Sequence, residues 1–519
     1  MDKLKRILCV ALLLLTVVAV YGCEKDDATE AVPAVYWCMD TELPAAEADG
    51  SYVLDFICDG KQVSYRCADA TLAETICLQS VMGLMLEGDT VTGVRFLHDM
   101  PQTLFAWNYY VKSMGGGKVK VNSEESMNGD ERMFAMTEQT KVYLVSALAD
   151  TPGEETELLK YDGVTVLTNK NGEAETIFVS NRSYKEDAEA TYCPHCEKDV
   201  IWSAWLSDQT VPFGAGHYRL EKDITLKKSF GLGGGKMCLD LNGKRIEQTT
   251  PGKRIYSVNG GMEFSIMDSV GSAVIRTSTA EPNAGASNTS GMAIGLYNSD
   301  AILNLYGGTF DGAGNRCQWA GVIEVKNGTF NMYEGTTILS ANPWSTGSGG
   351  VCVEGTFNMY GGKIVGGRMV EGPSYSPNPR GGAVVYVKGI MNMYGGSIEG
   401  GYCEYQGGIL YGLSGSVNLM GGTITGGEST QAGSGVYMAG GKLTLDGSIN
   451  VIGNEGDNIC MASGTTLILG NNLEDVKAGI SMVAPGVLGD CYIDALPEGL
   501  FSDDPAHKLV IRDGKLVLE

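Results

Sequence analysis

Five copies of one phrase determine the fold that this sequence predicts. They read NLYGGTF (Asn304–Phe310), NMYEGTTI (Asn331–Ile338), NMYGGKI (Asn358–Ile364), NMYGGSI (Asn392–Ile398) and NLMGGTI (Asn418–Ile424). The copies begin 27, 27, 34 and 26 residues apart, and a weaker copy, TLDGSI, begins 26 residues later at Thr444. A repeat of this length is typical of a solenoid, in which each coil covers the apolar face of its neighbour.

Side chains alternate within each phrase, so Phe357 and Met359 point to one side and Asn358 and Tyr360 to the other. The interior of a solenoid is apolar, which places Phe357 and Met359 in the core. The outer side is then expected to carry two columns of like residues, an asparagine column (Asn304, Asn331, Asn358, Asn392, Asn418) and a tyrosine column (Tyr306, Tyr333, Tyr360, Tyr394). Such columns either stabilise neighbouring strands or offer aromatic rings to a sugar.

Length and composition favour an elongated, exported protein. The chain has 519 residues, and its 72 glycines against 15 prolines indicate many tight turns rather than a disordered linker. The formal net charge of -24 disfavours nucleic acid and anionic lipid as partners, because such a surface repels phosphate. Nucleic acid is therefore not expected as a partner, and contact with the membrane is expected only through an N-terminal lipid. The loops between the repeats, not the charge, indicate a glycan or cell-surface ligand as the partner.

Residues 1–23 have the features of a bacterial export signal. Lys3, Lys5 and Arg6 precede the uncharged apolar stretch Ile7–Tyr21, which is too short for a comfortable membrane span. The stretch ends in Val-Tyr-Gly-Cys23, and this resembles a lipoprotein signal in which Cys23 carries the lipid anchor. The expected location is the extracellular cell surface, and ordinary cleavage near Gly22 with secretion is the alternative.

Residues 24–190 are expected to form a small, mostly antiparallel β domain. Short alternating runs are separated by turn signals, and Asn171-Gly172 predicts a hairpin between VTVLT and ETIFVS. The spacing of apolar residues predicts one short helix over Ala70–Met85. The cysteines of this region form two disulfides of unknown pairing or remain buried thiols: Cys38, Cys58, Cys67 and Cys77.

A Cys-Pro-His-Cys motif opens residues 191–300, which we expect to form an opening cap and the first coils. Cys193 and Cys196 have the spacing of a zinc knuckle, but tetrahedral zinc requires two further ligands. His195, His217 and Cys238 are candidates if the chain folds back, although the spacing does not require it. A disulfide between Cys193 and Cys196 and free thiols are the alternatives.

Several phrases beyond the repeat carry a resemblance to a known superfamily. They are VIWSAW from Val200, GHYRLEKDITLKKSF from Gly216, MCLDLNGKRI from Met237 and MEFSIMDSVGSAVI from Met262. Together with the repeat, they resemble right-handed parallel β-helix proteins of the pectin-lyase-like superfamily, in particular its glycine-rich exported bacterial members. The resemblance implies a right-handed parallel β-helix with glycine-rich coils over 301–490 and a C-terminal cap over 491–519. The superfamily contains lyases, glycosidases and adhesins, so the resemblance does not identify an activity.

The irregular loops after each phrase are the expected ligand-binding edge, because insertions in a solenoid gather on one side. The candidate ligand-binding residues are Trp319, Trp344, Tyr375, Tyr402 and Tyr405. Our leading hypothesis is a non-enzymatic adhesin or carbohydrate-binding protein. The alternatives are a polysaccharide lyase or glycoside hydrolase at the same edge, and a structural surface stalk. An enzyme would draw its catalytic groups from Glu371, Glu399, Glu404, Arg368 and Arg380, and a lyase would also need calcium.

Overall fold

The computed structural model divides the chain into two compact units, residues 1–182 and 183–519, each of which is described by itself. It describes residues 34–40, 43–79, 81–95, 105–123, 129–145, 153, 155–159, 162–182, 184–278, 292–317, 320–344, 347–370 and 381–519. Strands make up nearly all of the regular structure, so the predicted all-β class is confirmed. Cys23 lies outside the described residues.

The first unit contains two closed five-stranded barrels where the sequence suggested one small domain. The first barrel consists of β1 (Val35–Cys38), β2 (Tyr52–Cys58), β3 (Lys61–Cys67), β4 (Val81–Glu87) and β5 (Thr90–Arg95). The second consists of β6 (Phe105–Gly115), β7 (Lys118–Asn122), β8 (Glu131–Leu144), β9 (Gly163–Thr168) and β10 (Ala174–Asn181). The barrels have separate cores, centred on Leu54 and Phe56 in the first and on Val164 and Val166 in the second.

Three local predictions for this unit have different outcomes. β9 and β10 pair antiparallel around Asn171-Gly172, which confirms the hairpin. The helix is shorter than predicted, because α2 covers only Ala70–Gln79 and β4 begins at Val81. β4 pairs with both β1 and β5, so barrel closure overrides the helical spacing of its apolar residues. Of the two alternatives for the cysteines of this region, disulfides or buried thiols, the structure has free thiols, which are buried at Cys38, Cys67 and Cys77 and half-buried at Cys58.

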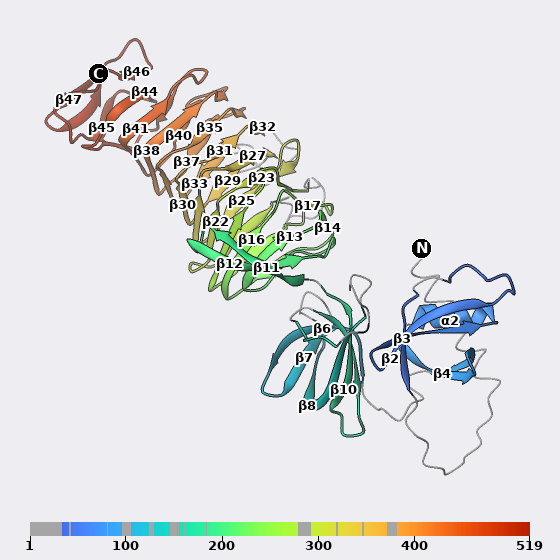
Figure 1. Cartoon of the computed structure of the whole chain (residues 1–519). Coiled ribbons are helices and arrows are strands. Elements are labelled where there is room, and N and C mark those ends of the chain that lie inside the picture. The colour runs from blue at the N-terminus through green and yellow to red at the C-terminus, as the bar shows by residue number, and fades with distance from the viewer. Residues whose placement is uncertain are drawn as a thin grey trace. The chain divides into compact units, whose positions relative to one another are not determined.

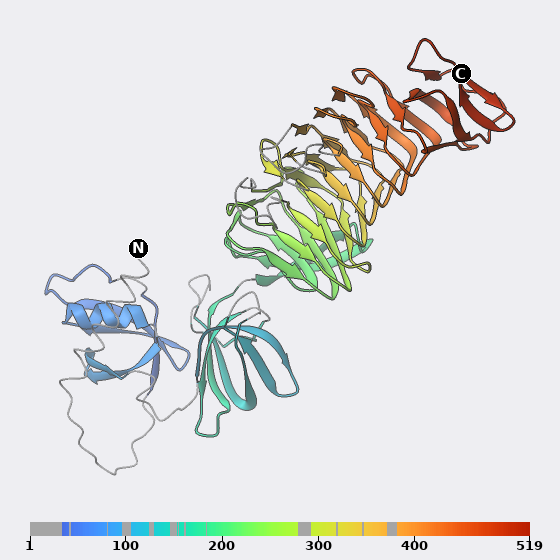
Figure 2. The same cartoon turned by 180° about the vertical axis from the view of Figure 1, so that it is seen from behind.

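The second unit is a parallel β-helix, with strands stacked coil upon coil on three faces (Figures 1 and 2). The first face contains β13 (Gly216–Leu220), β16 (Gly235–Asp240), β19 (Met262–Met267), β22 (Ile302–Leu305), β26 (Thr329–Met332), β30 (Thr356–Met359), β34 (Ile390–Met393), β43 (Thr466–Leu469) and the first halves of β38 (Ser416–Thr425) and β41 (Lys442–Val451).

The second face continues each coil. It contains β14 (Ile224–Leu226), β17 (Arg245–Gln248), β20 (Val274–Arg276), β23 (Gly308–Asp311), β27 (Thr336–Leu339), β31 (Lys363–Val365), β35 (Ser397–Glu399), the second halves of β38 and β41, and the start of β44 (Glu474–Met482). The third face contains β15 (Phe230–Leu232), β18 (Tyr256–Val258), β21 (Ile294–Leu296), β25 (Ile323–Val325), β29 (Val351–Val353), β33 (Val385–Val387), β37 (Leu410–Gly412), β40 (Val436–Met438), β42 (Ile459–Met461), the end of β44 and β46 (Leu500–Ser502).

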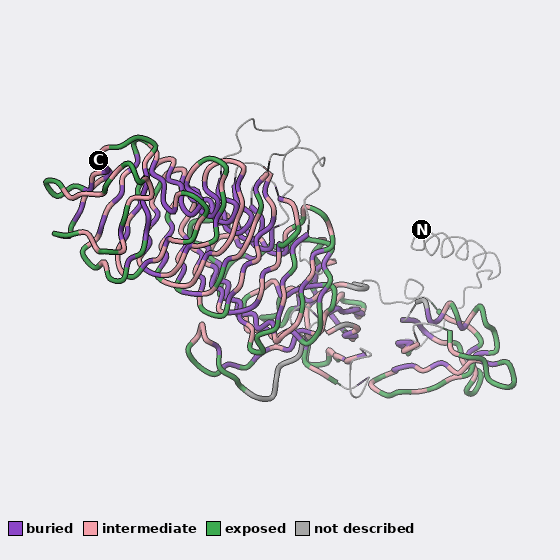
Figure 3. The backbone as a smooth tube through the Cα atoms, turned by 90° about the horizontal axis from the view of Figure 1, so that it is seen from above, coloured by how far each residue is buried: buried purple, intermediate pink, exposed green. Residues whose placement is uncertain are grey.

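The core of the β-helix follows the predicted alternation, and Figure 3 shows buried residues recurring along the stacked coils. The inward side chains of the repeat are fully buried: Leu303, Leu305, Phe330, Met332, Phe357, Met359, Met391, Met393, Val417, Leu419, Leu443 and Leu445. Phe330 and Phe357 stack with ring centroids 4.8 Å apart. Each coil therefore adds about two large apolar side chains, each worth roughly 1.5–3 kcal/mol on burial.

The asparagine column is a continuous chain of amide hydrogen bonds. Each side-chain Nδ2 donates to Oδ1 of the asparagine one coil earlier at 2.8 Å, in the order Asn418, Asn392, Asn358, Asn331 and Asn304. Asn304 then donates to Ser265 Oγ at 3.1 Å. Because Asn carries both donors and an acceptor, one residue type can repeat this bond along the stack. The column fixes the register of one coil on the next.

Close packing between coils explains the glycine pair of the phrase. Gly362 and Gly396 both have φ of +82°, which L side chains rarely adopt. A Cβ at Gly396 would also lie 2.5 Å from the carbonyl oxygen of Gly362 in the preceding coil. The second glycine is therefore required both by the turn into the second face and by contact with the neighbouring turn.

The two ends of the β-helix are closed by antiparallel strands. β11 (Tyr184–Cys193) and β12 (Lys198–Trp205) form a hairpin, and β12 pairs in parallel with β13. At the other end, β45 (Gly486–Asp490), β47 (Leu509–Arg512) and β48 (Lys515–Leu518) form a small sheet, with Asp513-Gly514 as its turn. In the part of the chain that the structure describes, no helix is long and apolar enough to cross a membrane.

Truncation of a core methionine tests the inward face. We expect Met359→Ala to cost about 2–5 kcal/mol, because it removes a fully buried side chain and leaves a cavity. Ile390→Thr, at a site that is 44% exposed on the next strand, should change stability by less than about 0.5 kcal/mol. Urea unfolding of both variants measures this difference. Equal losses in the two variants would contradict the assignment of the core face.

Candidate metal centre and loop edge

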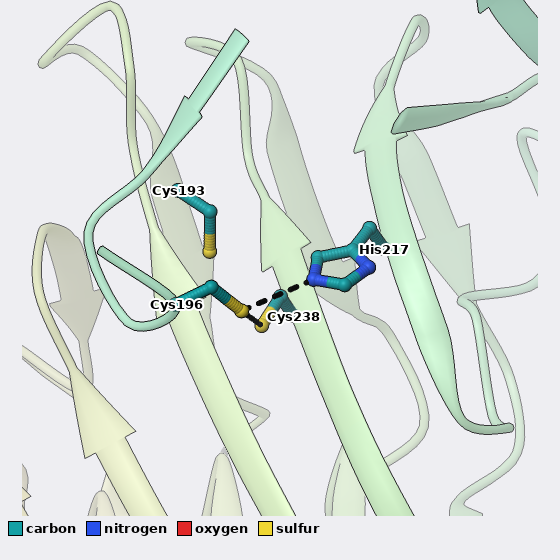
Figure 4. Close-up of side chains that lie close together, drawn as sticks. All are labelled: Cys193, Cys196, His217 and Cys238. Carbon is teal, nitrogen blue, oxygen red and sulfur yellow. Dashed lines mark hydrogen bonds between the residues drawn. The ribbon is translucent and has the colours of Figure 1, made fainter. Parts of the chain in front are cut away.

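Four potential metal ligands meet where the β11–β12 hairpin contacts the first coils of the β-helix (Figure 4). Cys193 is the last residue of β11 and Cys196 lies in the hairpin turn, whereas His217 lies on β13 and Cys238 on β16. Their ligand atoms all lie within 4.8 Å of one another. Cys196 Sγ is 3.3 Å from His217 Nε2 and 4.0 Å from Cys238 Sγ.

Strand pairing brings these residues together. His217 and Cys238 are direct partners across β13 and β16, so they occupy the same position in consecutive coils. Cys193 pairs with Lys198 across the hairpin, and Glu197 completes the turn at a φ of +53°. The sequence named His217 and Cys238 only as candidates, because their approach depends on this register.

The environment of the cluster is compact and mostly apolar. Cys193 and Cys238 are buried, Cys196 and His217 are half-buried, and Val200, Trp202 and Met267 pack around the thiols. The edge of the Trp202 ring meets the His217 ring in a T-shaped contact at 5.7 Å. The four ligand atoms thus lie close together at the boundary of a buried cluster.

Hydrogen bonding within the cluster favours a thiolate. Bonds from the Cys238 thiol, from His217 and from the Cys196 backbone lower the pKa of Cys193 to about 3. The hydrogen bond with Cys193, followed by burial, raises the pKa of the Cys238 thiol, and burial raises that of Cys196. The interactions of the cluster thus favour the charged form of Cys193 and the neutral forms of Cys196 and Cys238.

His195, the other predicted candidate, is directed away from the cluster. Its Nε2 lies 3.3 Å from Glu263 Oε1, and its Nδ1 lies 3.4 Å from the Tyr306 hydroxyl. Lys236 Nζ reaches the other oxygen of Glu263 at 2.7 Å. His195 therefore belongs to a polar contact beside the cluster and does not supply a ligand atom to it.

The loops between the second and third faces form a ladder of their own, which we call the edge ladder. It consists of the outward residues of five two-residue strands: Arg316 of β24 (Arg316–Cys317), Asn342 of β28 (Asn342–Pro343), Arg368 of β32 (Arg368–Met369), Tyr402 of β36 (Tyr402–Cys403) and Glu428 of β39 (Glu428–Ser429). The Arg368 N–H donates to Asn342 Oδ1 at 3.0 Å, which joins the two groups of strands. The inward residues Cys317, Met369 and Cys403 are fully buried.

Two aromatic residues predicted to bind ligand are held by arginine on this edge. The Arg368 guanidinium lies 4.0 Å from the centroid of the Tyr402 ring, and that of Arg316 lies 5.1 Å from the Trp344 ring. Tyr405 is half-buried, and its N–H donates to Cys403 Sγ at 3.4 Å. Trp319 and Tyr375 lie outside the described residues.

The predicted catalytic groups are distributed over different strands. Glu399 lies on β35 and pairs with Lys363 Nζ of the preceding coil at 2.6 Å, while Ser397 Oγ donates to it at 2.9 Å. These contacts, with that of Lys363 the larger, hold the pKa of Glu399 below its ordinary value of 4.5. Glu404 follows β36, and its N–H donates to the Met369 carbonyl. Glu371 and Arg380 lie outside the described residues.

No protein-family model, curated protein or solved structure matches the chain. The site therefore has to be interpreted from its own geometry.

A double-mutant cycle on Lys363→Met and Glu399→Gln tests whether Glu399 is a structural ion-pair partner. Both side chains are partly exposed, so we expect a coupling free energy of only about 0.2–1 kcal/mol at pH 7. The folded-state pKa of Glu399 is lowered, so this contribution is present above its unfolded pKa and is lost as pH falls through the folded value. Denaturant unfolding at pH 7 and at acid pH measures the coupling. Zero coupling at both pH values would contradict the ion pair.

Proposed function

We propose that this protein is an exported, surface-anchored β-helix protein that binds a glycan without chemical turnover. The export signal with Cys23 as lipid anchor supports the location. The resemblance to glycine-rich exported members of the pectin-lyase-like superfamily supports a carbohydrate as the ligand. The parallel β-helix supplies the rigid, extended scaffold on which repeated loops present side chains.

The edge ladder is the observation that carries this proposal. Consecutive coils place Arg316, Asn342, Arg368, Tyr402 and Glu428 in one row, at a spacing of about 4.8 Å per coil. Guanidinium, amide, phenol and carboxylate groups together provide donors and acceptors for the hydroxyl groups of a sugar. A row of such groups matches a linear polysaccharide better than a compact small molecule.

The arginines of the edge ladder also hold two aromatic rings in place, Tyr402 within the ladder and Trp344 beside it. Arg368 lies over Tyr402 and Arg316 over Trp344, so each ring is oriented before a ligand arrives. Guanidinium groups additionally form bidentate pairs with carboxylates, which suits an acidic sugar. Preorganised side chains lose little entropy on binding, which favours this edge as a recognition surface.

The tyrosine column on the first face is a weaker candidate. Tyr306, Tyr333, Tyr360 and Tyr394 stack in sequence, with centroids 4.4, 5.2 and 5.0 Å apart. Tyr360 is 46% exposed, yet both faces of its ring are covered by Tyr333 and Tyr394. A sugar needs a free ring face for stacking, which Tyr333 and Tyr360 lack, so these rings serve the cohesion of the coils.

Hydrolysis and β-elimination receive less support from the same edge. A glycosidase needs a carboxylic acid that keeps its proton near neutral pH. Glu399 has the opposite environment, because Lys363 and Ser397 favour its ionised form. Its ion pair with Lys363 also occupies the carboxylate that would otherwise bind calcium or substrate in a lyase.

Binding of the purified chain to a glycan array tests the proposed function. We expect at least one polysaccharide to bind, and Arg368→Ala, Tyr402→Ala and Trp344→Ala each to weaken its apparent affinity by about tenfold, or roughly 1.4 kcal/mol. Arg245→Ala and Tyr492→Ala, at exposed positions away from the edge ladder, are the matched controls and should bind as the unchanged chain does.

Two results would contradict the proposal. Binding that survives all three edge variants would exclude the edge ladder as the glycan site. An array without any bound glycan would favour the structural stalk.

A lyase assay separates binding from turnover. Because Glu399 is engaged by Lys363, we expect no increase in ultraviolet absorbance when the chain is incubated with uronate polysaccharides, with or without calcium. An increase that Arg368→Ala abolishes would instead make this edge a polysaccharide lyase site.

A further inference from the structure

We propose that Cys193, Cys196, His217 and Cys238 bind one structural zinc ion, which fastens the β11–β12 hairpin to the first two coils. This site is independent of the glycan-binding edge, because it lies on the first face at the start of the β-helix. Its ligands come from three different strands and a turn, so the ion would link segments that are distant in sequence.

The geometry of the cluster matches tetrahedral zinc. Zn–S bonds of about 2.3 Å and Zn–N bonds of about 2.0 Å place the ligand atoms of a tetrahedral site roughly 3.5–3.8 Å apart. The Cys196–His217 and Cys196–Cys238 separations are 3.3 and 4.0 Å, and every pair lies within 4.8 Å. Small adjustments of side chains would therefore be enough to coordinate the ion.

The ligand set also selects the metal. Three cysteines and one histidine form a standard structural zinc set, and thiolates disfavour calcium and magnesium, which prefer oxygen ligands. The Cys-x-x-Cys segment supplies two ligands from one tight turn, and Cys196 Sγ lies close to both ligands of the coils, His217 and Cys238. This combination is typical of a zinc knuckle rather than of a redox pair.

A disulfide accounts for the cluster less well. The sulfur atoms of Cys196 and Cys238 are 4.0 Å apart, whereas a disulfide requires about 2.05 Å. Any single bridge would also leave the third thiol and the histidine in the same crowded, apolar space without a cation. One zinc ion uses all four side chains at once.

Four protein ligands leave no open position for substrate, so the ion has a structural role. Val200, Trp202 and Met267 belong to the same buried cluster as Cys193 and Cys238, and Trp202 also packs against the His217 ring. Such a closed site contributes its binding energy to folding and does not activate water.

The position of the site in the stack indicates what it stabilises. Register places His217, Cys238, Ser265 and Asn304 in one column across β13, β16, β19 and β22. The amide chain of the asparagine column ends at Ser265 Oγ, so the two coils before it lack this link. Zinc coordination by His217 and Cys238 would join these coils instead and would seal the open end with the hairpin.

The test uses the full chain, purified under reducing conditions and analysed by elemental mass spectrometry. We expect about one zinc per chain, released by a chelator. Replacement with Co²⁺ should give thiolate-to-cobalt charge-transfer absorption together with the strong visible bands of a tetrahedral site. The spectrum of the unchanged chain is informative even if a ligand variant fails to fold.

Variants identify the ligands. Cys196→Ser and His217→Gln should lose the tetrahedral cobalt spectrum, whereas His195→Gln and Cys352→Ser, a neighbouring histidine and a buried cysteine of the third face, should retain it. The proposal is overturned if the reduced chain binds neither metal, or if the metal survives in Cys196→Ser and His217→Gln but is lost in His195→Gln.

Discussion

In-register stacking of parallel strands is the constraint on which the rest of the β-helix depends. Each coil lies about 4.8 Å from the next, so a residue type repeated at one position becomes a continuous column. The asparagine column is the clearest case, because amides of Asn304, Asn331 and Asn358 bond one another at 2.8 Å. A shift of one residue would turn these amides into the core and expel Met359, so the hydrogen-bond chain and the apolar interior enforce the same register.

The same stacking determines where specific chemistry arises. Regular positions give columns of like residues. Their side chains interact with one another and so hold the coils together, as the stacked rings of Tyr333 and Tyr360 do. Departures from regularity bring unlike residues together. The edge ladder combines Arg368 with Tyr402, and the first two coils combine His217 with Cys238 where the asparagine column has ended. We therefore propose recognition and metal binding at the irregular positions.

The sequence predicted the parts of the fold that depend on periodicity. Alternation in Phe357, Asn358, Met359 and Tyr360 was sufficient to separate the core from the outer columns, because a strand has a period of two. Periodicity did not distinguish the two barrels of the first unit, and it predicted a helix that continues past Gln79. Both errors arise because barrel closure depends on pairing between strands that are distant in sequence.

The candidate site was only partly predictable for the same reason. Cys193 and Cys196 were found from their spacing, but the choice of His217 and Cys238 over His195 depends on the register of β13 and β16. Likewise, the role of Glu399 follows from Lys363 one coil away, a partner that no local pattern indicates.

Zinc K-edge X-ray absorption of the purified full chain tests the central claim most directly, because it measures the atoms around the ion. The register of the first coils predicts three sulfur atoms at about 2.3 Å and one nitrogen atom at about 2.0–2.1 Å. A shell made only of oxygen and nitrogen atoms, or one with fewer than three sulfur atoms, would contradict the convergence of Cys193, Cys196, His217 and Cys238 on a single ion.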